Sequence, residues 1–200
     1  MKALILLFPI IHPVTIRICL FAVSALFLTG CAGTFREVRP QTMGAPPAQT
    51  PTTLVMGEMK ITDNRVAKME AEAFAHALRR GVNNWSLTNK VFQTIETAMP
   101  GSKPASGSLV LTGTVTEVEK GSQAMRFIVG MGAGQARLVG DFTLSDDTGK
   151  TLAAFKARRS YLGGVGIGGL DMLSTEEMFL RLGEVVAETT SKWLLGKKMD

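Results

Sequence analysis

A short apolar segment that ends at Cys31 separates a leader from the rest of the chain. Lys2 and Arg17 supply positive charge ahead of an apolar core over residues 18–28. That core is too short to cross a bilayer as a helix, which takes about 20 apolar residues. A basic start, a short apolar core and small residues before the cut are typical of a secretory signal. We therefore expect residues 1–30 to be removed and the rest of the chain to fold without them.

The tetrapeptide at the end of the leader, Leu28-Thr29-Gly30-Cys31, resembles the lipobox of bacterial lipoproteins. The resemblance implies that a signal peptidase cuts between Gly30 and Cys31. It also implies that the Cys31 thiol receives a diacylglycerol through a thioether and that the new amine is acylated, with palmitate as the test label. Two or three fatty chains are the number that stable anchoring needs. The alternative is an uncleaved N-terminal anchor with an incidental cysteine.

The residues after the leader form a chain of moderate size and mild charge. Removing Lys2 and Arg17 leaves 20 basic residues against 17 acidic ones over 170 residues, a net charge of +3. This excess is compatible with nearby anionic lipid and is too small to indicate nucleic acid as a partner. Because Cys19 leaves with the leader and Cys31 would carry lipid, we expect no disulfide and a fold held by its core.

Residues 31–52 read as a lipidated N-terminus and a flexible, proline-rich tether. Four prolines lie there among Gln, Thr, Ala and Gly, with little apolar surface to bury. Ala32 stands after the cysteine where Asp would signal retention, and so resembles the outer-membrane sorting class. In a Gram-negative cell this implies a protein anchored in the outer membrane and facing the periplasm.

The first half of the remaining chain predicts a strand, a helix and a second strand. Residues 53–61 read as a strand, and apolar residues from Val66 follow helical spacing to about Trp85. Asp63 or Asn64 would cap that helix. Residues 90–98 fit a strand or a helical turn, and we favour the strand. A loop rich in Pro, Gly and Ser follows over 100–108.

The second half predicts strands followed by a helix. Apolar residues alternate over 109–115, 136–144 and 153–161, and a turn at 146–149 would join the last two as a hairpin. Ser174 and Glu177 form a capping box for a final helix that stops at Gly196.

These elements predict one α+β domain over residues 53–196 and a basic tail over 197–200. Its sheet would be mixed but rich in antiparallel pairs, with the helices packed on it. The predicted order is strand, helix, strand, strand, hairpin, helix.

Two glycine-rich apolar stretches, 121–134 and 162–173, flank the predicted hairpin. Both would leave the same end of it, opposite the turn at 146–149. Exposed Met, Ile and Val there would form an apolar patch of the kind that marks contact sites. The alternative is that both stretches are tight turns packed on the domain. The candidate contact residues are Arg126, Gly130, Gly132, Gly134, Gly164, Gly166 and Gly168.

The first glycine-rich stretch also carries a family resemblance. The residues concerned are Gly121-Ser122, Ala124, Arg126, Gly130, Gly132-Ala133-Gly134 and Asp147-Thr148-Gly149. They resemble bacterial lipoproteins of the domain-of-unknown-function 4410 type, over about residues 53–195. At the level of the fold, the layout is more distantly similar to curli-secretion lipoproteins of the CsgG kind, which insert strands into the outer membrane. Fold-level similarity is a weak guide to function.

Residues for common catalytic chemistry are sparse after the leader. His76 is the one histidine there, in a helical segment, and with no free cysteine it offers almost nothing for zinc. Gly149-Lys150-Thr151 resembles the end of a phosphate-binding loop, but Leu144 occupies the position where the motif requires its first glycine. We expect no enzyme activity, no metal and no cofactor.

Charged residues have simple structural explanations. Asp146 and Asp147 belong to a turn, and Glu176 and Glu177 to the start of a helix, where negative charge is favourable. None of the acidic residues Asp141, Asp146, Asp147, Asp171, Glu176 and Glu177 needs a catalytic explanation. The basic residues near the glycine-rich stretches are Arg126, Arg137, Arg158 and Arg159, which would form a basic face or line a solvated strand edge.

The chain is therefore predicted to be a membrane-anchored envelope lipoprotein, a non-enzymatic binding or assembly module in the periplasm. Its partners would be the bilayer, through acylated Cys31, and another envelope protein or its own copies. The alternative is an export or pore-forming component related to curli-type secretion. A third possibility is an enzyme that acts on the cell wall or on a small molecule.

Overall fold

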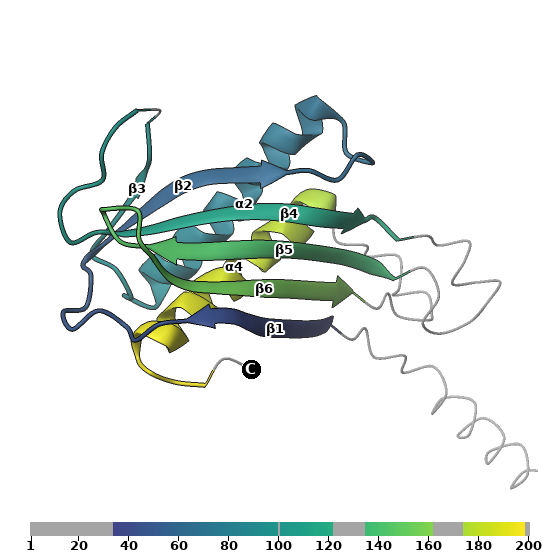
Figure 1. The fold of residues 1–200 in the computed structure, drawn as a ribbon. Helices are drawn as coiled ribbons and strands as arrows, with labels where there is room; N and C mark the ends of the chain where they lie inside the picture. The colour runs from purple at the N-terminus through teal and green to yellow at the C-terminus, as the bar shows by residue number, and fades with distance from the viewer. Residues whose placement is uncertain (1–33, 100, 122–134, 162–173, 199–200) are drawn as a thin grey trace, which may run out of the picture.

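The computed structural model describes residues 34–99, 101–121, 135–161 and 174–198, which form a six-stranded sheet and two helices (Figure 1). The sheet has the order β1-β6-β5-β4-β2-β3. The elements are β1 (Thr34–Met43), β2 (Thr53–Ile61), α2 (Lys68–Thr88), β3 (Thr94–Thr97), β4 (Leu109–Glu119), β5 (Ala136–Ser145), β6 (Thr151–Tyr161) and α4 (Thr175–Leu194).

The sheet is mixed, as the sequence predicts. β2 is parallel to β3 and to β4, whereas β4, β5, β6 and β1 pair in antiparallel fashion. The predicted hairpin is β5 and β6, joined by a turn in which Gly149 has a positive φ of 87°. The predicted strand over 90–98 is confirmed as the shorter β3. Apart from β1, the order of elements follows the prediction.

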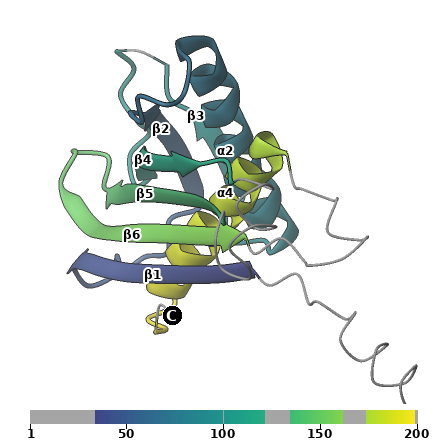
Figure 2. The ribbon, with the colours of Figure 1, turned by 90° about the vertical axis from the view of Figure 1, so that its right-hand side faces the viewer.

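Alternation along the strands sends one set of side chains into a single core. Leu111 on β4, Leu138 on β5 and Phe155 on β6 are completely buried, as the period of two predicts. Both helices cover this face of the sheet, and no element among the described residues covers the other face (Figures 1 and 2). The protein therefore has two layers, with the core between them.

The two helices touch backbone to backbone at a pair of glycines. A Cβ at Gly81 of α2 would lie 1.9 Å from the Leu180 oxygen, and a Cβ at Gly183 of α4 would lie 2.2 Å from the Leu78 oxygen. Beside this contact, the rings of Phe74 and Phe179 stack with centroids 4.8 Å apart. The absence of side chains at the two glycines thus sets how closely the helices approach.

The prediction of a flexible tether over 31–52 is wrong for Thr34–Met43, which forms β1 at the edge of the sheet. Its backbone pairs with β6 from Thr34 opposite Tyr161 to Met43 opposite Ala153. Because β1 buries little apolar surface, backbone hydrogen bonds and ion pairs hold it instead. Arg36, for example, reaches across to Glu188 of α4.

The helix ends agree with the sequence at α4 and differ at α2. Ser174 caps α4 by accepting a hydrogen bond from the Glu177 N–H, and Gly196 follows the helix with a φ of 63°. The α2 cap, however, is Ala67, whose N–H donates to Glu70 at 3.3 Å, so the predicted cap at Asp63 or Asn64 is wrong. Asp63 is engaged elsewhere, as described below.

Among the described residues, no helix is long and apolar enough to cross a membrane.

We expect Gly183→Ala to destabilise the protein although alanine favours helices. The added methyl would meet the α2 backbone, and overpacking of this kind costs about 1–3 kcal/mol or more, which outweighs the gain of up to about 1 kcal/mol in helix propensity. Denaturant unfolding measures the change. Asn84→Ala, on the exposed side of α2, is the control and should change stability by less than about 0.5 kcal/mol. An unchanged midpoint for Gly183→Ala would contradict the close helix contact.

Candidate functional site

The sheet face that the helices leave uncovered, which we call the open face, carries many charged side chains. It consists of the side chains on β1, β6, β5 and β4 that alternate with the buried ones. Across these strands Glu37 is opposite Arg158, which is opposite Val139. Likewise Arg39 is opposite Lys156, which is opposite Asp141. The register thus places acidic and basic residues side by side.

Ion pairs connect the open face across three strands. The Glu37 carboxylate lies 2.5 Å from Nε of Arg39 and 3.7 Å from Nη1 of Arg158. Lys156 lies 3.4 Å from Asp141, which also accepts a hydrogen bond from the Gln41 amide at 2.8 Å. These side chains are partly exposed, so each pair adds little stability. The network arranges charges on the surface more than it holds the fold together.

A shallow depression of about 160 Å³ lies in the middle of the open face. Four basic and two acidic side chains line it together with one valine. The lining residues are Glu37, Arg39, Glu117, Arg137, Val139, Lys156 and Arg158. Excess positive charge suits a carboxylate or another anionic group.

Two guanidinium groups at the depression have unused hydrogen-bonding capacity. Nε of Arg137 and Nε of Arg158 are buried and have no hydrogen-bond partner within the described part of the chain. Arg137 nevertheless pairs through its other nitrogens with Glu117 and, at 3.2 Å, with Glu119. A buried N–H without an acceptor costs about 1–3 kcal/mol. An anionic group of a partner that enters the depression would supply such an acceptor.

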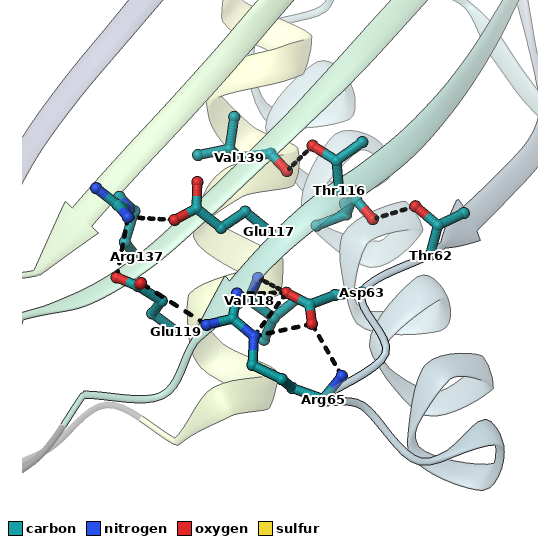
Figure 3. Close-up of polar contacts among 10 residues, drawn as sticks. Thr62, Asp63, Arg65, Thr116, Glu117, Val118, Glu119, Arg137 and Val139 are labelled. Carbon is teal, nitrogen blue, oxygen red and sulfur yellow. Dashed lines mark hydrogen bonds and ion pairs between the residues drawn. The ribbon is translucent and has the colours of Figure 1, made fainter.

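One end of the open face is tied to the start of α2 by a buried carboxylate (Figure 3). Asp63 follows β2 and accepts hydrogen bonds from the Val118 N–H at 2.6 Å and from the Arg65 N–H and guanidinium at 2.6–3.2 Å. Val118 stands just after an irregularity in the β4–β5 pairing, between Val115 and Glu117. Asp63 therefore accepts a hydrogen bond from β4 just beyond the end of the β2–β4 pairing.

The charges around Asp63 extend to the open face. Arg65 reaches Glu119 at 3.7 Å, and Glu119 in turn pairs with Arg137. The hydrogen bond from the Arg65 guanidinium, with those from the Arg65 and Val118 N–H groups, holds the pKa of the Asp63 carboxyl far below its usual range, although burial opposes the shift. Asp63 is therefore ionised in the folded protein under ordinary conditions.

Several elements begin or finish at one end of the sheet, which we call the proximal end because it is nearest to Cys31 along the chain. β1 starts there at Thr34, opposite Tyr161, the last residue of β6, which is also opposite Ala136, the first of β5. The Tyr161 hydroxyl donates to the Met178 oxygen, so the start of α4 lies there too. The opposite, distal end holds the turn at 146–149 (Figure 1).

The positions of the sequence-predicted residues fall into two groups. Gly121, Gln135, Tyr161 and Ser174, which flank the glycine-rich stretches, are described, and the ends of β4 and β6 and the start of β5 meet at the proximal end as predicted. The candidate residues themselves lie outside the described residues. These are Gly30, Cys31, Arg126, Gly130, Gly132, Gly134, Gly164, Gly166 and Gly168.

The predicted basic face is confirmed only in part. Arg137 and Arg158 share the open face, but they stand on inner strands rather than at a solvated edge. Arg159 points to the opposite side, where it donates to the Arg181 oxygen at 3.0 Å and lies over the Tyr161 ring. Each arginine on the open face also has an acidic partner, so the face is mixed in charge.

The acidic residues singled out from the sequence have structural partners where they are described. Asp146 accepts from Thr148 and Lys150 within the turn, and Asp147 accepts from the Gly107 N–H. Glu176 pairs with Arg80, and Glu177 pairs with Arg181. Asp171 lies outside the described residues.

His76 is exposed on α2, as expected. Within the described ranges no group of three or more His, Cys, Asp or Glu residues is placed to hold a metal ion.

Sequence reasoning missed the contribution of β1 to the site. Glu37 and Arg39 line the depression, yet both fell in the predicted tether. Val38 is half-buried, most other residues of β1 are exposed, and Pro40 interrupts the strand pattern. The alternation of Phe35, Glu37 and Arg39 with Arg36 and Val38 was the signal available.

One comparison with known proteins identifies a family. Residues 54–164 match a family described as Domain of unknown function (DUF4410). No curated protein matches the chain.

Solved structures show only distant similarity. PelC from Paraburkholderia phytofirmans, a dodecamer, has 10% sequence identity and a TM-score of 0.49 over 82% of this chain and 99% of that chain. A variant of that PelC dodecamer gives 12% identity and a TM-score of 0.43 over 75% and 98%. A minor lipoprotein from Acinetobacter baumannii gives 15% identity and a TM-score of 0.36 over 72% and 94%.

The Asp63 contacts predict how stability depends on pH. Because the folded-state pKa lies below the unfolded value of about 3.9, the carboxylate contributes its stability above that value and loses it as the pH falls further. Asp63→Asn should lower stability at pH 7 by about 1–3 kcal/mol and flatten the acid branch of the stability curve.

Denaturant unfolding between pH 7 and pH 2 measures both effects. Asn64→Ala, a change at the exposed neighbour, is the control and should keep the parent's acid branch. An Asp63→Asn variant that still loses stability in acid as steeply as the parent would show that Asp63 is not responsible.

Proposed function

The chain belongs to the family of the domain of unknown function DUF4410, and on this premise we propose that it is a lipid-anchored protein of the bacterial envelope that binds a partner and does not catalyse a reaction. The observation that carries the proposal is the order Leu28-Thr29-Gly30-Cys31 directly ahead of a folded domain. Ala32 after the cysteine favours the outer membrane, with the domain in the periplasm of a Gram-negative cell.

A binding role is supported by what the open face offers. Its charged residues are paired with one another, and the depression is shallow and carries unused guanidinium N–H groups. Such a surface suits an acidic group on a protein better than a small substrate that must be enclosed, because enzymes and small-ligand sites are concave and largely apolar. We therefore assign it to contact with a macromolecule.

The partner that we propose is another envelope protein or a second copy of this chain. Its contact surface would combine the glycine-rich stretches 121–134 and 162–173 with the neighbouring open face. The support is positional, because the residues that flank both stretches meet at the proximal end, where β5 and β6 carry Arg137 and Arg158. Glycine also allows close backbone approach.

Lipidation is tested by Cys31→Ala. The parent should incorporate labelled palmitate and fractionate with the outer membrane, whereas Cys31→Ala should incorporate none and leave the membrane fraction or keep its leader. Cys19→Ala provides a matched control because it removes the other cysteine, which leaves with the leader. Should the parent take up no label, or the Cys31→Ala protein mature and fractionate as the parent does, the anchoring proposal is wrong.

Partner contact is tested by adding bulk and charge to the proposed surface. Gly132→Glu and Gly166→Glu should each reduce the envelope protein recovered by affinity purification of the anchored protein, because a charged side chain would block close approach. Lys156→Glu should do the same by reversing a charge in the depression. Thermal unfolding of each variant separates lost contact from lost fold.

The control for partner contact is Lys103→Glu, which reverses an exposed charge in the loop before β4. It should recover the same proteins as the parent. If all three test variants also recover them in parental amounts, neither the glycine-rich stretches nor the open face is a contact surface.

A further inference from the structure

The structure leaves very little chain between the proposed lipid site and the folded domain. Thr34, three residues after Cys31, is already paired with Tyr161 in the sheet. Three residues span at most about 11 Å even when fully extended. A flexible tether of about 20 residues, by contrast, would reach a few tens of ångström. The start of β1 must therefore lie within about 11 Å of the acylated residue.

Among the orientations that so short a connection permits, two differ in which part of β1 meets the bilayer. In the first, the strands stand up from the membrane and the proximal end faces the lipid. In the second, the strands lie parallel to the membrane and the outer edge of β1 contacts the lipid surface. β1 spans ten residues, about 33 Å, so the orientations differ strongly in where its far end at Met43 would be.

The chemistry of the β1 edge disfavours the second orientation. β1 is an edge strand, so every second backbone N–H and C=O group points away from β6 and needs water or a partner. Laying that edge against lipid would remove water without supplying partners, which is costly for each group. This orientation would also place the exposed Arg39 against the lipid. Among its described residues, the proximal end exposes no such row of strand-edge groups.

We propose that the protein sits on the membrane with its proximal end against the lipid surface and its distal end facing away. This orientation rests on the proposed acylation of Cys31. It brings the starts of β1 and α2 close to the headgroups, since Glu70 of α2 pairs at 3.3 Å with Lys120, just beyond the end of β4. It holds the end of α4 far away, where Trp193 donates to the Gly44 oxygen just beyond β1.

Two exposed apolar residues provide matched reporters. Met69, at the start of α2, is 88% exposed, and Leu195, at the end of α4, is 62% exposed. Because the acylated chain would have no other free thiol, Met69→Cys and Leu195→Cys can each carry one fluorescent label. Both positions are at the surface, so neither change should disturb the fold.

The acylated, full-length variants are reconstituted into phospholipid vesicles that carry a nitroxide quencher on the headgroup. We expect the label at position 69 to lose most of its fluorescence and the label at position 195 to match vesicles without quencher. Quenching at 195 with none at 69 would establish the other orientation and overturn the proposal. Equal quenching at both positions, or at neither, would overturn it too.

A parallel measurement separates this proposal from the proposed function. Palmitate incorporation is followed in the same two preparations. If palmitate is incorporated and the quenching pattern is wrong, the orientation fails while the anchor stands. If no palmitate is incorporated and the protein does not bind vesicles, the proposed anchoring fails, and the orientation fails with it.

Discussion

The contact between Gly81 and Gly183 is the constraint on which the two-layer arrangement depends. With a side chain at either position the helix backbones could not approach as they do, and Phe74 and Phe179 could not stack beside them. Because α2 and α4 pack this closely, they lie in one layer on one face of the sheet. No element among the described residues covers the other face, and its side chains are accordingly charged and paired with one another.

Polar interactions secure the sheet at two places, the end of β4 and the edge strand β1. At the β4 side, Asp63 replaces the departing β2 as a hydrogen-bond acceptor for Val118. At the other side, β1 is held by its backbone ladder with β6 and by the Arg36–Glu188 pair to α4. These contacts position Glu37 and Arg39 at the depression. The lining of the depression is therefore complete only because β1 is part of the fold.

The sequence predicted those parts of the fold that depend on local patterns. Period-two alternation located β4, β5 and β6, and the Ser174 cap located α4. Pairing between distant residues leaves no such pattern, so the Gly81–Gly183 contact, the role of Asp63 and the attachment of β1 were missed. The family match over 54–164 likewise leaves out β1 and α4. The lipid site and the glycine-rich contact residues stay predictions, because they lie outside the described residues.

The properties of β1 also bear on where a partner would bind. An open strand edge can pair with another chain, but β1 carries charged side chains, Pro40, and an irregular register between Pro40 and Thr42. These features discourage the addition of a further strand. At the opposite edge, β3 has only four residues to offer. With both edges poorly suited to pairing, the surface that we propose for a partner stays the open face together with the glycine-rich stretches beside it. In the orientation that we propose, a partner on this surface would approach from the side of the domain. The short segment between Cys31 and Thr34 would then determine the direction of approach as well as the location.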